Sequence, residues 1–193
     1  ELFNQPNTIL LDGGMGTMLQ AAGMKLGTRP EDLNIENPEL IRSIHAKYAA
    51  AGSRVVNANT FGASPHKLAD SKYTLEEVIT AGIANCKQAV APYGALVTLD
   101  VGPLGELLEP SGTLAFEDAV AEYGRIVRAG VAAGADILYF ETFTDLYEMK
   151  AALLAAKENS TLPIMASMSF EANGRTFTGC TVESFAATAR GLG

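Results

Sequence analysis

The segment Ile9–Thr17, which reads ILLDGGMGT, joins an apolar run to an acid and three glycines. A short apolar run that ends in turn residues is typical of a buried strand. Asp12 then lies at the exit of that strand, and Gly13 and Gly14 allow a close approach of bare backbone. The segment therefore predicts a buried strand, a tight turn and the start of a helix, with a carboxylate between them.

A phosphate-binding loop is the first function that a glycine-rich turn suggests, and this turn does not fit one. A dinucleotide fingerprint needs G-x-G-x-x-G, but Leu19 stands where the third glycine belongs, and there is no G-x-x-x-x-G-K-[ST] pattern. Asp12 also places a negative charge where a pyrophosphate would lie. Two interpretations remain. One is a structural turn whose glycines adopt positive φ; the other is a site for a cation or a zwitterion.

Composition excludes several classes of protein. The chain has 193 residues, of which 48% are hydrophobic, so it is able to bury a core in one domain or in part of a larger one. A net charge of −8 without a basic cluster argues against nucleic acid and against anionic membrane surfaces as partners. No run approaches the roughly eighteen apolar residues of a membrane span, and no signal peptide is visible. Two cysteines without metal-ligand spacing indicate a reducing compartment, so we expect a cytoplasmic protein.

Five apolar, β-rich runs alternate with helical patterns, and this alternation predicts parallel strands with crossover helices. The runs are Thr8–Leu11, Arg54–Ala58, Ala95–Leu99, Ile137–Phe140 and Pro163–Met168.

Signals at the helix ends support the alternation. The sequence Thr74-Leu75-Glu76-Glu77 is a capping box, and the helix that it opens carries Cys86 on its apolar face, as a core thiol. Asn37-Pro38 starts an earlier helix, on which we expect His45 to be packed or half-exposed rather than catalytic. Near the C-terminus, Asn173-Gly174 predicts a hairpin turn.

Every one of the five runs ends in polar or acidic residues. These exits are Asp12, Asn57–Thr60, Asp100, Glu141–Thr142 and Ser167–Ser169. In a βα barrel the carboxyl ends of all strands meet at one mouth, where catalytic residues gather. A doubly wound sheet uses its strand ends chiefly at one switch point. The pattern favours the barrel, and a doubly wound α/β domain that binds an unrelated small ligand remains the alternative.

The chain is short for a complete barrel, which has eight strands and typically about 250 residues. We therefore predict an α/β protein that supplies about the first five βα units of a (βα)8 TIM-type barrel. Residues 1–193 would form a partial barrel domain whose C-terminal part is missing from the chain.

Four segments, in order along the chain, resemble the homocysteine S-methyltransferase family. They read LLDGGMGTMLQ (10–20), VVNANTFGASPHKL (55–68), ETFTDLYEMKAALLAAKE (141–158) and ASMSFEANGRTFTG (166–179). The resemblance is closest to the N-terminal homocysteine-binding domain of cobalamin-dependent methionine synthase. It implies a barrel with zinc at its mouth, and methyl transfer to the homocysteine thiolate that gives methionine. The methyl donor would be a methylcobalamin or methyltetrahydrofolate module, betaine or S-methylmethionine.

The resemblance also implies roles for residues at the strand exits. Asp12 and Glu141 would flank the ammonium group of homocysteine, as both catalytic and binding residues. The N–H groups around Gly13 and Gly14 would approach the amino-acid head. The substrate-binding residues implied in this way are Asp12, Gly13, Gly14, Asn59, Thr60 and Glu141.

The zinc ligands of the family have no counterpart in this sequence. They are cysteines in a G-x-N-C-type and a G-G-C-C-type segment, and Cys86 and Cys180 match neither. We therefore assign no metal ligand here and expect the zinc ligands beyond residue 193. Alone, the chain would hold the amino-acid-binding half of the site and would be inactive. The alternative is a truncated or partner-completed binding module of the same ancestry that is not an enzyme.

Overall fold

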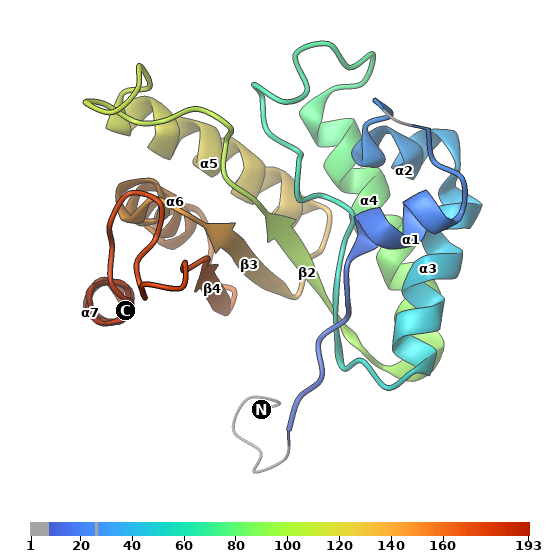
Figure 1. Cartoon of the computed structure of the whole chain (residues 1–193). Coiled ribbons are helices and arrows are strands. Elements are labelled where there is room, and N and C mark those ends of the chain that lie inside the picture. The colour runs from blue at the N-terminus through green and yellow to red at the C-terminus, as the bar shows by residue number, and fades with distance from the viewer. Residues whose placement is uncertain (1–7, 26) are drawn as a thin grey trace.

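The computed structural model describes residues 8–25 and 27–193 and contains a parallel sheet of four strands that alternate with helices (Figure 1). The strands are β1 (Val55–Asn57), β2 (Leu96–Val101), β3 (Ile137–Phe143) and β4 (Ile164–Met168). The helices are α1 (Met15–Ala21), α2 (Leu33–Glu36), α3 (Pro38–Ala50), α4 (Leu75–Val90), α5 (Phe116–Ala132), α6 (Leu146–Asn159) and α7 (Val182–Leu192), with 3-10 turns η2 (Pro30–Asp32) and η3 (Ala91–Tyr93). None of the helices in these described ranges is long and apolar enough to cross a membrane.

The order of the strands distinguishes the two predicted architectures. The sheet runs β1-β2-β3-β4, and every strand pairs in parallel with the next one in the sequence. From α3 to α7, each helix packs against the next one in the sequence. Helices α4, α5 and α6 lie along one face of the sheet (Figure 1). A doubly wound sheet reverses its strand order at a switch point. The α/β fold is thus a partial TIM-type barrel, and the doubly wound alternative is wrong.

The first predicted strand, Thr8–Leu11, is reduced to a single bridge. Leu11 pairs with Val55 in parallel, and the carbonyl of Leu10 accepts the N–H of Arg54 at 2.8 Å. The segment follows the course of a strand beside β1, but Leu10 is 54% exposed. The apolar run is therefore only partly covered by the core, and α1 begins soon after it. Within residues 8–25 and 27–193, four strands and this bridge stand in place of the five predicted strands.

Helix starts follow the signals in the sequence. Thr74 and Glu77 form the capping box at the start of α4, each side chain bonding the other residue's N–H. Asn37 accepts the N–H of Leu40 at the start of α3, and Asp145 accepts two N–H groups at the start of α6. These side chains satisfy amide groups that a helix leaves without internal partners. The predicted helix positions are confirmed.

The main core lies between the sheet and helices α4 to α6. Cys86 is 0% exposed within it, which confirms the predicted core thiol. Helix α5 comes especially near to β2, because a Cβ atom on Gly130 would lie 2.4 Å from a methyl carbon of Leu99. The fully buried strand and helix residues include Val56, Val78, Ile79, Ile83, Leu99, Ile126, Val127, Leu138, Phe140 and Met149.

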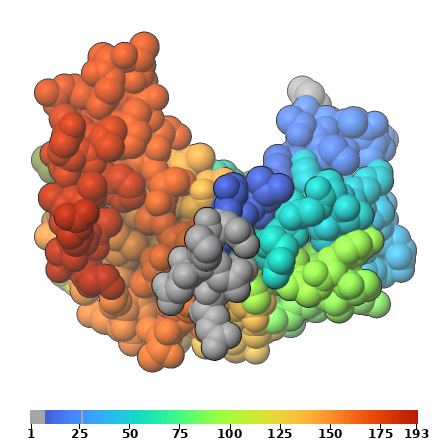
Figure 2. All heavy atoms as spheres, turned by 90° about the horizontal axis from the view of Figure 1, so that it is seen from below, coloured from blue at the N-terminus to red at the C-terminus, as the bar shows by residue number. Residues whose placement is uncertain are grey.

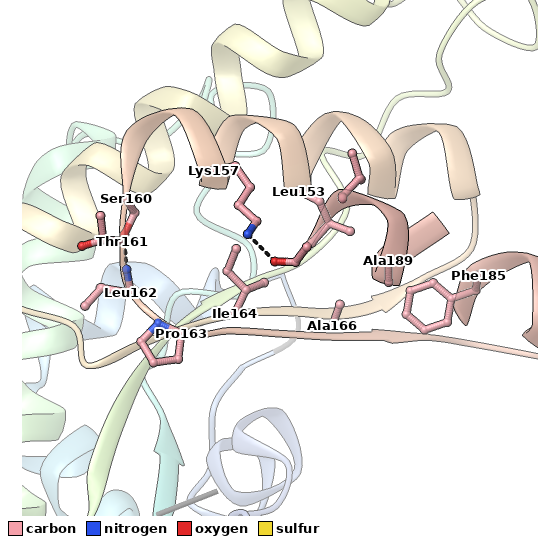
Figure 3. A pocket seen from close by; sticks show the side chains of 12 residues that line it. Leu153, Lys157, Ser160, Thr161, Leu162, Pro163, Ile164, Ala166, Phe185 and Ala189 are labelled. Carbon is pink, nitrogen blue, oxygen red and sulfur yellow. Dashed lines mark hydrogen bonds between the residues drawn. The ribbon is translucent and has the colours of Figure 1, made fainter. Parts of the chain in front are cut away.

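Strand β4 forms an edge of the sheet. All five of its residues are only partly buried, and no second strand pairs with it in the described part of the chain. An apolar groove of about 560 Å³ lies between β4, α6 and α7, lined by Leu153, Ile164 and Phe185 among others (Figure 3). Figure 2 shows the C-terminal part of the chain, in orange and red, across an open notch from the N-terminal helices in blue.

The predicted turn at Asn173-Gly174 is present without strands on its two sides. Gly174 has a φ of +74° and its N–H bonds the carbonyl of Glu171. Across the turn the N–H of Glu171 bonds the carbonyl of Arg175 at 2.9 Å, and the antiparallel bridge from Arg175 to Thr181 closes the next turn of the loop. The connection from β4 to α7 is thus a compact loop instead of a hairpin.

Candidate functional site

Three carboxylic acids from neighbouring parts of the sheet line one cavity at the carboxyl ends of the strands. Asp12 follows the bridge residue Leu11, Asp100 is the penultimate residue of β2, and Glu141 lies in the last half of β3. The cavity has a volume of about 170 Å³. The structure thus brings Asp12 and Glu141 together, as expected for residues at the exits of parallel strands. The rest of the wall is Gly13, Gly14, Met15, Asn57, Ala58, Asn59 and Phe61.

A second cavity of about 310 Å³ adjoins the first. The two share Met15, Asn59, Phe61, Asp100 and Glu141. Together they give the site room for a small organic molecule, with an acidic side and an apolar side.

One carboxylate oxygen of Asp12 accepts a hydrogen bond, and the other has no partner among the described residues. Oδ2 accepts the N–H of Asn57 at 3.0 Å, whereas Oδ1 is buried without a partner among the described residues. Burial raises the pKa of Asp12 to about 7, with a smaller contribution from the charge of Glu141. The bond from Asn57 opposes this shift, because it favours the charged form.

Asp100 is the most buried of the three acids that line the first cavity, with 6% of its surface exposed. Thr60 fixes its backbone on both sides: the hydroxyl accepts the N–H of Asp100 at 3.1 Å and donates to its carbonyl at 2.8 Å. Oδ1 of the side chain is buried and has no partner among residues 8–25 and 27–193. Burial, followed by the charges of Glu141 and Asp12, raises the pKa of Asp100 well above its ordinary range.

Glu141 precedes an irregular step in β3. The register with β4 shifts between Phe140 and Phe143, and Thr142 adopts a φ of +57°, a strained conformation for a residue other than glycine. Ser167 of β4 holds this step, because its hydroxyl accepts the N–H of Thr142 at 3.0 Å. Burial raises the pKa of Glu141 above its ordinary value.

The structure separates the two predicted polar lining residues, Asn59 and Thr60. Asn59 lies in the wall of both cavities, but its amide donates to Pro30 (2.7 Å) and to the side chain of Asn34 (2.9 Å). Thr60 is 1% exposed and is not part of either wall. Asn59 therefore links the cavity wall to Asn34 of α2, and Thr60 holds the backbone of Asp100 through hydrogen bonds.

Gly13 and Gly14 line the cavity with backbone alone, and neither has a positive φ. The interpretation that these glycines permit positive φ is therefore wrong. Gly13 instead has a close neighbour: a Cβ atom there would lie 3.0 Å from the ring of Tyr48 on α3, a tight contact. The hydroxyl of Tyr48 also donates to the carbonyl of Gly14 at 3.1 Å, which fixes the turn.

The acids of the site are not balanced by bases. No lysine, arginine or histidine belongs to the described residues that line either cavity. Lys67 is nearby, but its ammonium donates to the carbonyl of Pro103 at 2.6 Å and lies over the ring of Phe61. An excess of buried carboxyl groups favours a cationic ligand over an anion. This supports the cation or zwitterion interpretation of the sequence.

The residues present do not fit a zinc site. Within the described residues there is no group of three or more His, Cys, Asp or Glu side chains that could hold a metal ion. Cys86 is sealed in the core, where burial raises the pKa of its thiol. Cys180 lies in the loop before α7, with Sγ 3.2 Å from the carbonyl of Thr181. Neither cysteine lines the acidic cavities.

Comparison with known families identifies the chain. The family model of homocysteine S-methyltransferase matches residues 9–192, nearly the whole sequence. The chain belongs to the homocysteine S-methyltransferase family. Membership in this methyltransferase family confirms the resemblance that the four segments indicate.

Crystal structures of the Escherichia coli homocysteine methyltransferase MmuM are similar to this chain. The oxidized form has a TM-score of 0.87 at 24% identity, and the match covers 99% of this chain and 72% of that one. The metallated form has a TM-score of 0.84 at 23% identity, with 99% and 73% covered. At these identities the likeness establishes the fold.

Proposed function

We propose that this chain binds the amino-acid head of homocysteine, as part of an enzyme that methylates the homocysteine thiolate to give methionine. The observation that carries the proposal is the pair Asp12 and Glu141 in a cavity whose described lining residues include no basic side chain, in a member of this family. The similar MmuM structures, named as homocysteine methyltransferase, support the same substrate.

The cavity matches the parts of homocysteine. Asp12 and Glu141 accept the ammonium group, each as a charge-assisted hydrogen bond of about 1.5–3 kcal/mol. Gly13 and Gly14 present only backbone polar groups to the cavity, which suits the α-carboxylate. Met15 and Phe61 provide the apolar side for the methylene groups.

The family resemblance implies zinc as a cofactor, with its ligands beyond residue 193. Because the residues present do not fit that ion, no step of the reaction is assigned to it here. A cobalamin-bearing module as the methyl donor, betaine or S-methylmethionine as alternative donors, and the cytoplasmic location stay predictions.

Calorimetric titration with L-homocysteine tests the proposal. At pH 8, Asp12→Asn and Glu141→Gln should each weaken binding about tenfold or more, the loss of roughly 1.4 kcal/mol. The exposed Glu171→Gln is the matched control and should bind as the parent chain does. Unchanged affinity in both site variants, or no binding by the parent chain, would contradict the proposal.

A binding module without catalysis is the second candidate, favoured by the missing metal-ligand set in the described residues. An assay for methionine formed from homocysteine, with S-methylmethionine as donor, separates the two. Turnover by the 193-residue chain alone would rule out the module, whereas binding without turnover would support it.

A further inference from the structure

We propose that Asp100 is a third acceptor for the ammonium group of the substrate, beside Asp12 and Glu141. This inference rests on the proposed function and deepens it, because it assigns a binding residue that no motif of the sequence indicated. It makes the site one in which a single ammonium group is surrounded by three carboxyl groups.

The position of Asp100 in β2 directs its side chain to the cavity. Its neighbours Leu99 and Val101 belong to the core on the helix side of the sheet. Successive residues of a strand face opposite sides, and Asp100 accordingly lines both cavities. Since Thr60 satisfies the N–H and the carbonyl of this residue, only the carboxyl group is left to meet a ligand.

The number of carboxyl groups in the cavity matches the number of N–H donors of an ammonium group. An ammonium group carries three N–H donors. Asp12 and Asp100 each have an Oδ1 that is buried and without a partner in the described part of the chain, and Glu141 supplies the third carboxyl. Without a ligand donor at Asp100, its Oδ1 would stay buried and unpaired in the described part of the chain, at a cost comparable to a lost hydrogen bond.

The charges around Asp100 require a cation for all three acids to ionise. The groups that face it are Glu141 from β3, Asp12 from the turn after Leu11, Glu31 from η2, and the phenol of Tyr139. Burial and the neighbouring carboxylates raise the pKa of Asp100 and of Asp12, so the empty site retains protons. An ammonium group favours the ionised acids, and its binding should therefore release protons.

Three ligands distinguish contact with the ammonium from a general structural effect. L-homocysteine has both charged groups, 3-mercaptopropylamine lacks the carboxylate, and 4-mercaptobutyrate lacks the ammonium. Asp100→Asn keeps the shape of the side chain and should weaken the binding of the two amines about tenfold. It should change the binding of 4-mercaptobutyrate by less than about twofold, because this acid has no ammonium group to contact Asp100.

Titration in buffers of different ionisation enthalpy adds an independent measurement. Asp100→Asn should release fewer protons than the parent chain on binding homocysteine. Asp100→Ala is the second variant, for use if the first does not fold, and the exposed Asp70→Asn is the matched control. Parental affinity for both amines, equal losses for all three ligands, or an unchanged proton count in a folded variant would overturn the inference.

The outcomes for the parent chain keep this test separate from the proposed function. If the parent chain does not bind homocysteine, the proposed function fails and the role of Asp100 fails with it. If it binds, and Asp12→Asn and Glu141→Gln weaken binding while Asp100→Asn does not, only the role of Asp100 is refuted.

Discussion

The backbone N–H of Asn57 donates to Oδ2 of Asp12 at 3.0 Å, so the end of β1 holds the acid that follows Leu11. The second oxygen, Oδ1, is buried and unpaired within the described residues. The carboxyl group is therefore positioned without being neutralised. A buried carboxyl group with an unpaired oxygen destabilises the empty protein, and it favours the binding of a ligand that carries a positive charge.

Asp12→Asn should stabilise the empty protein above neutral pH. The pKa of Asp12 is raised from its ordinary value of 3.8 to about 7, so the folded chain holds a proton that the unfolded chain has lost. Its contribution to stability is complete below about pH 4 and is lost as the pH rises through about 7. The asparagine still accepts the N–H of Asn57. Urea unfolding should show a gain on the order of 2 kcal/mol at pH 8 and little change at pH 4.5. Equal gains at the two pH values would contradict this assignment.

Homocysteine binding should strengthen between pH 6 and pH 8. The ammonium group prefers the ionised form of Asp12, whose pKa in the empty site is about 7. A single carboxyl group with this pKa is about 10% ionised at pH 6 and about 90% at pH 8, which predicts an affinity gain of about ninefold. Calorimetry across this range measures the slope, and Asp12→Asn should flatten it. A flat profile in the parent chain would show that Asp12 does not titrate on binding.

His45 should make the protein sensitive to acid. The prediction of a packed helix residue is confirmed: His45 lies on α3 with 0% exposure, and both ring nitrogens are buried without partners in the described ranges. Burial lowers the pKa of His45 from 6.5 to about 4. The unfolded chain therefore takes up a proton first, and stability falls as the pH drops from about 6.5 to 4.

Replacing this side chain tests the acid sensitivity. His45→Leu should remove a loss on the order of 2–3 kcal/mol between pH 6.5 and 4, measured by chemical unfolding. The exposed His66→Gln is the matched control, since the chain has two histidines. An unchanged slope in His45→Leu would place the acid sensitivity elsewhere.

Gly130→Ala should destabilise the contact between α5 and β2. The added methyl group would lie 2.4 Å from Leu99, in a core without room for it. Overpacking of this kind typically costs about 1–3 kcal/mol. Gly191→Ala in α7 is the matched control, because a Cβ atom there meets nothing within 4 Å. Thermal unfolding should show a large loss for the first variant and no loss for the second; similar values would indicate that α5 shifts to make room.

The sequence predicts the convergence of Asp12 and Glu141 because the carboxyl ends of parallel strands share one edge of a sheet. It does not identify Asp100 as a site residue, although it marks it as a strand exit. Which of two adjacent residues faces the interior depends on the register of β2, and register follows from pairing with β1 and β3. The neighbours Leu99 and Val101, both apolar, were the available signal.

Two further differences come from distant contacts. One interpretation of the glycines after Asp12 rests on their local conformational freedom, whereas in the structure a Cβ atom at Gly13 would crowd the ring of Tyr48 on helix α3. The family resemblance implies Thr60 as a lining residue, whereas in the structure its hydroxyl donates to the carbonyl of Asp100. Neither contact has a local signature in the sequence, since each joins segments that only the tertiary fold brings together.

The partly buried edge strand β4 also has a consequence for the dynamics of the sheet. Amide groups on its open side have no ladder partner in the described part of the chain, whereas β2 bonds a strand on each side. Local opening needs less free energy where backbone bonds face solvent. Amide hydrogen exchange should therefore be fastest in β4 and slowest in β2, so the place of each strand in the sheet determines how long its amides retain deuterium.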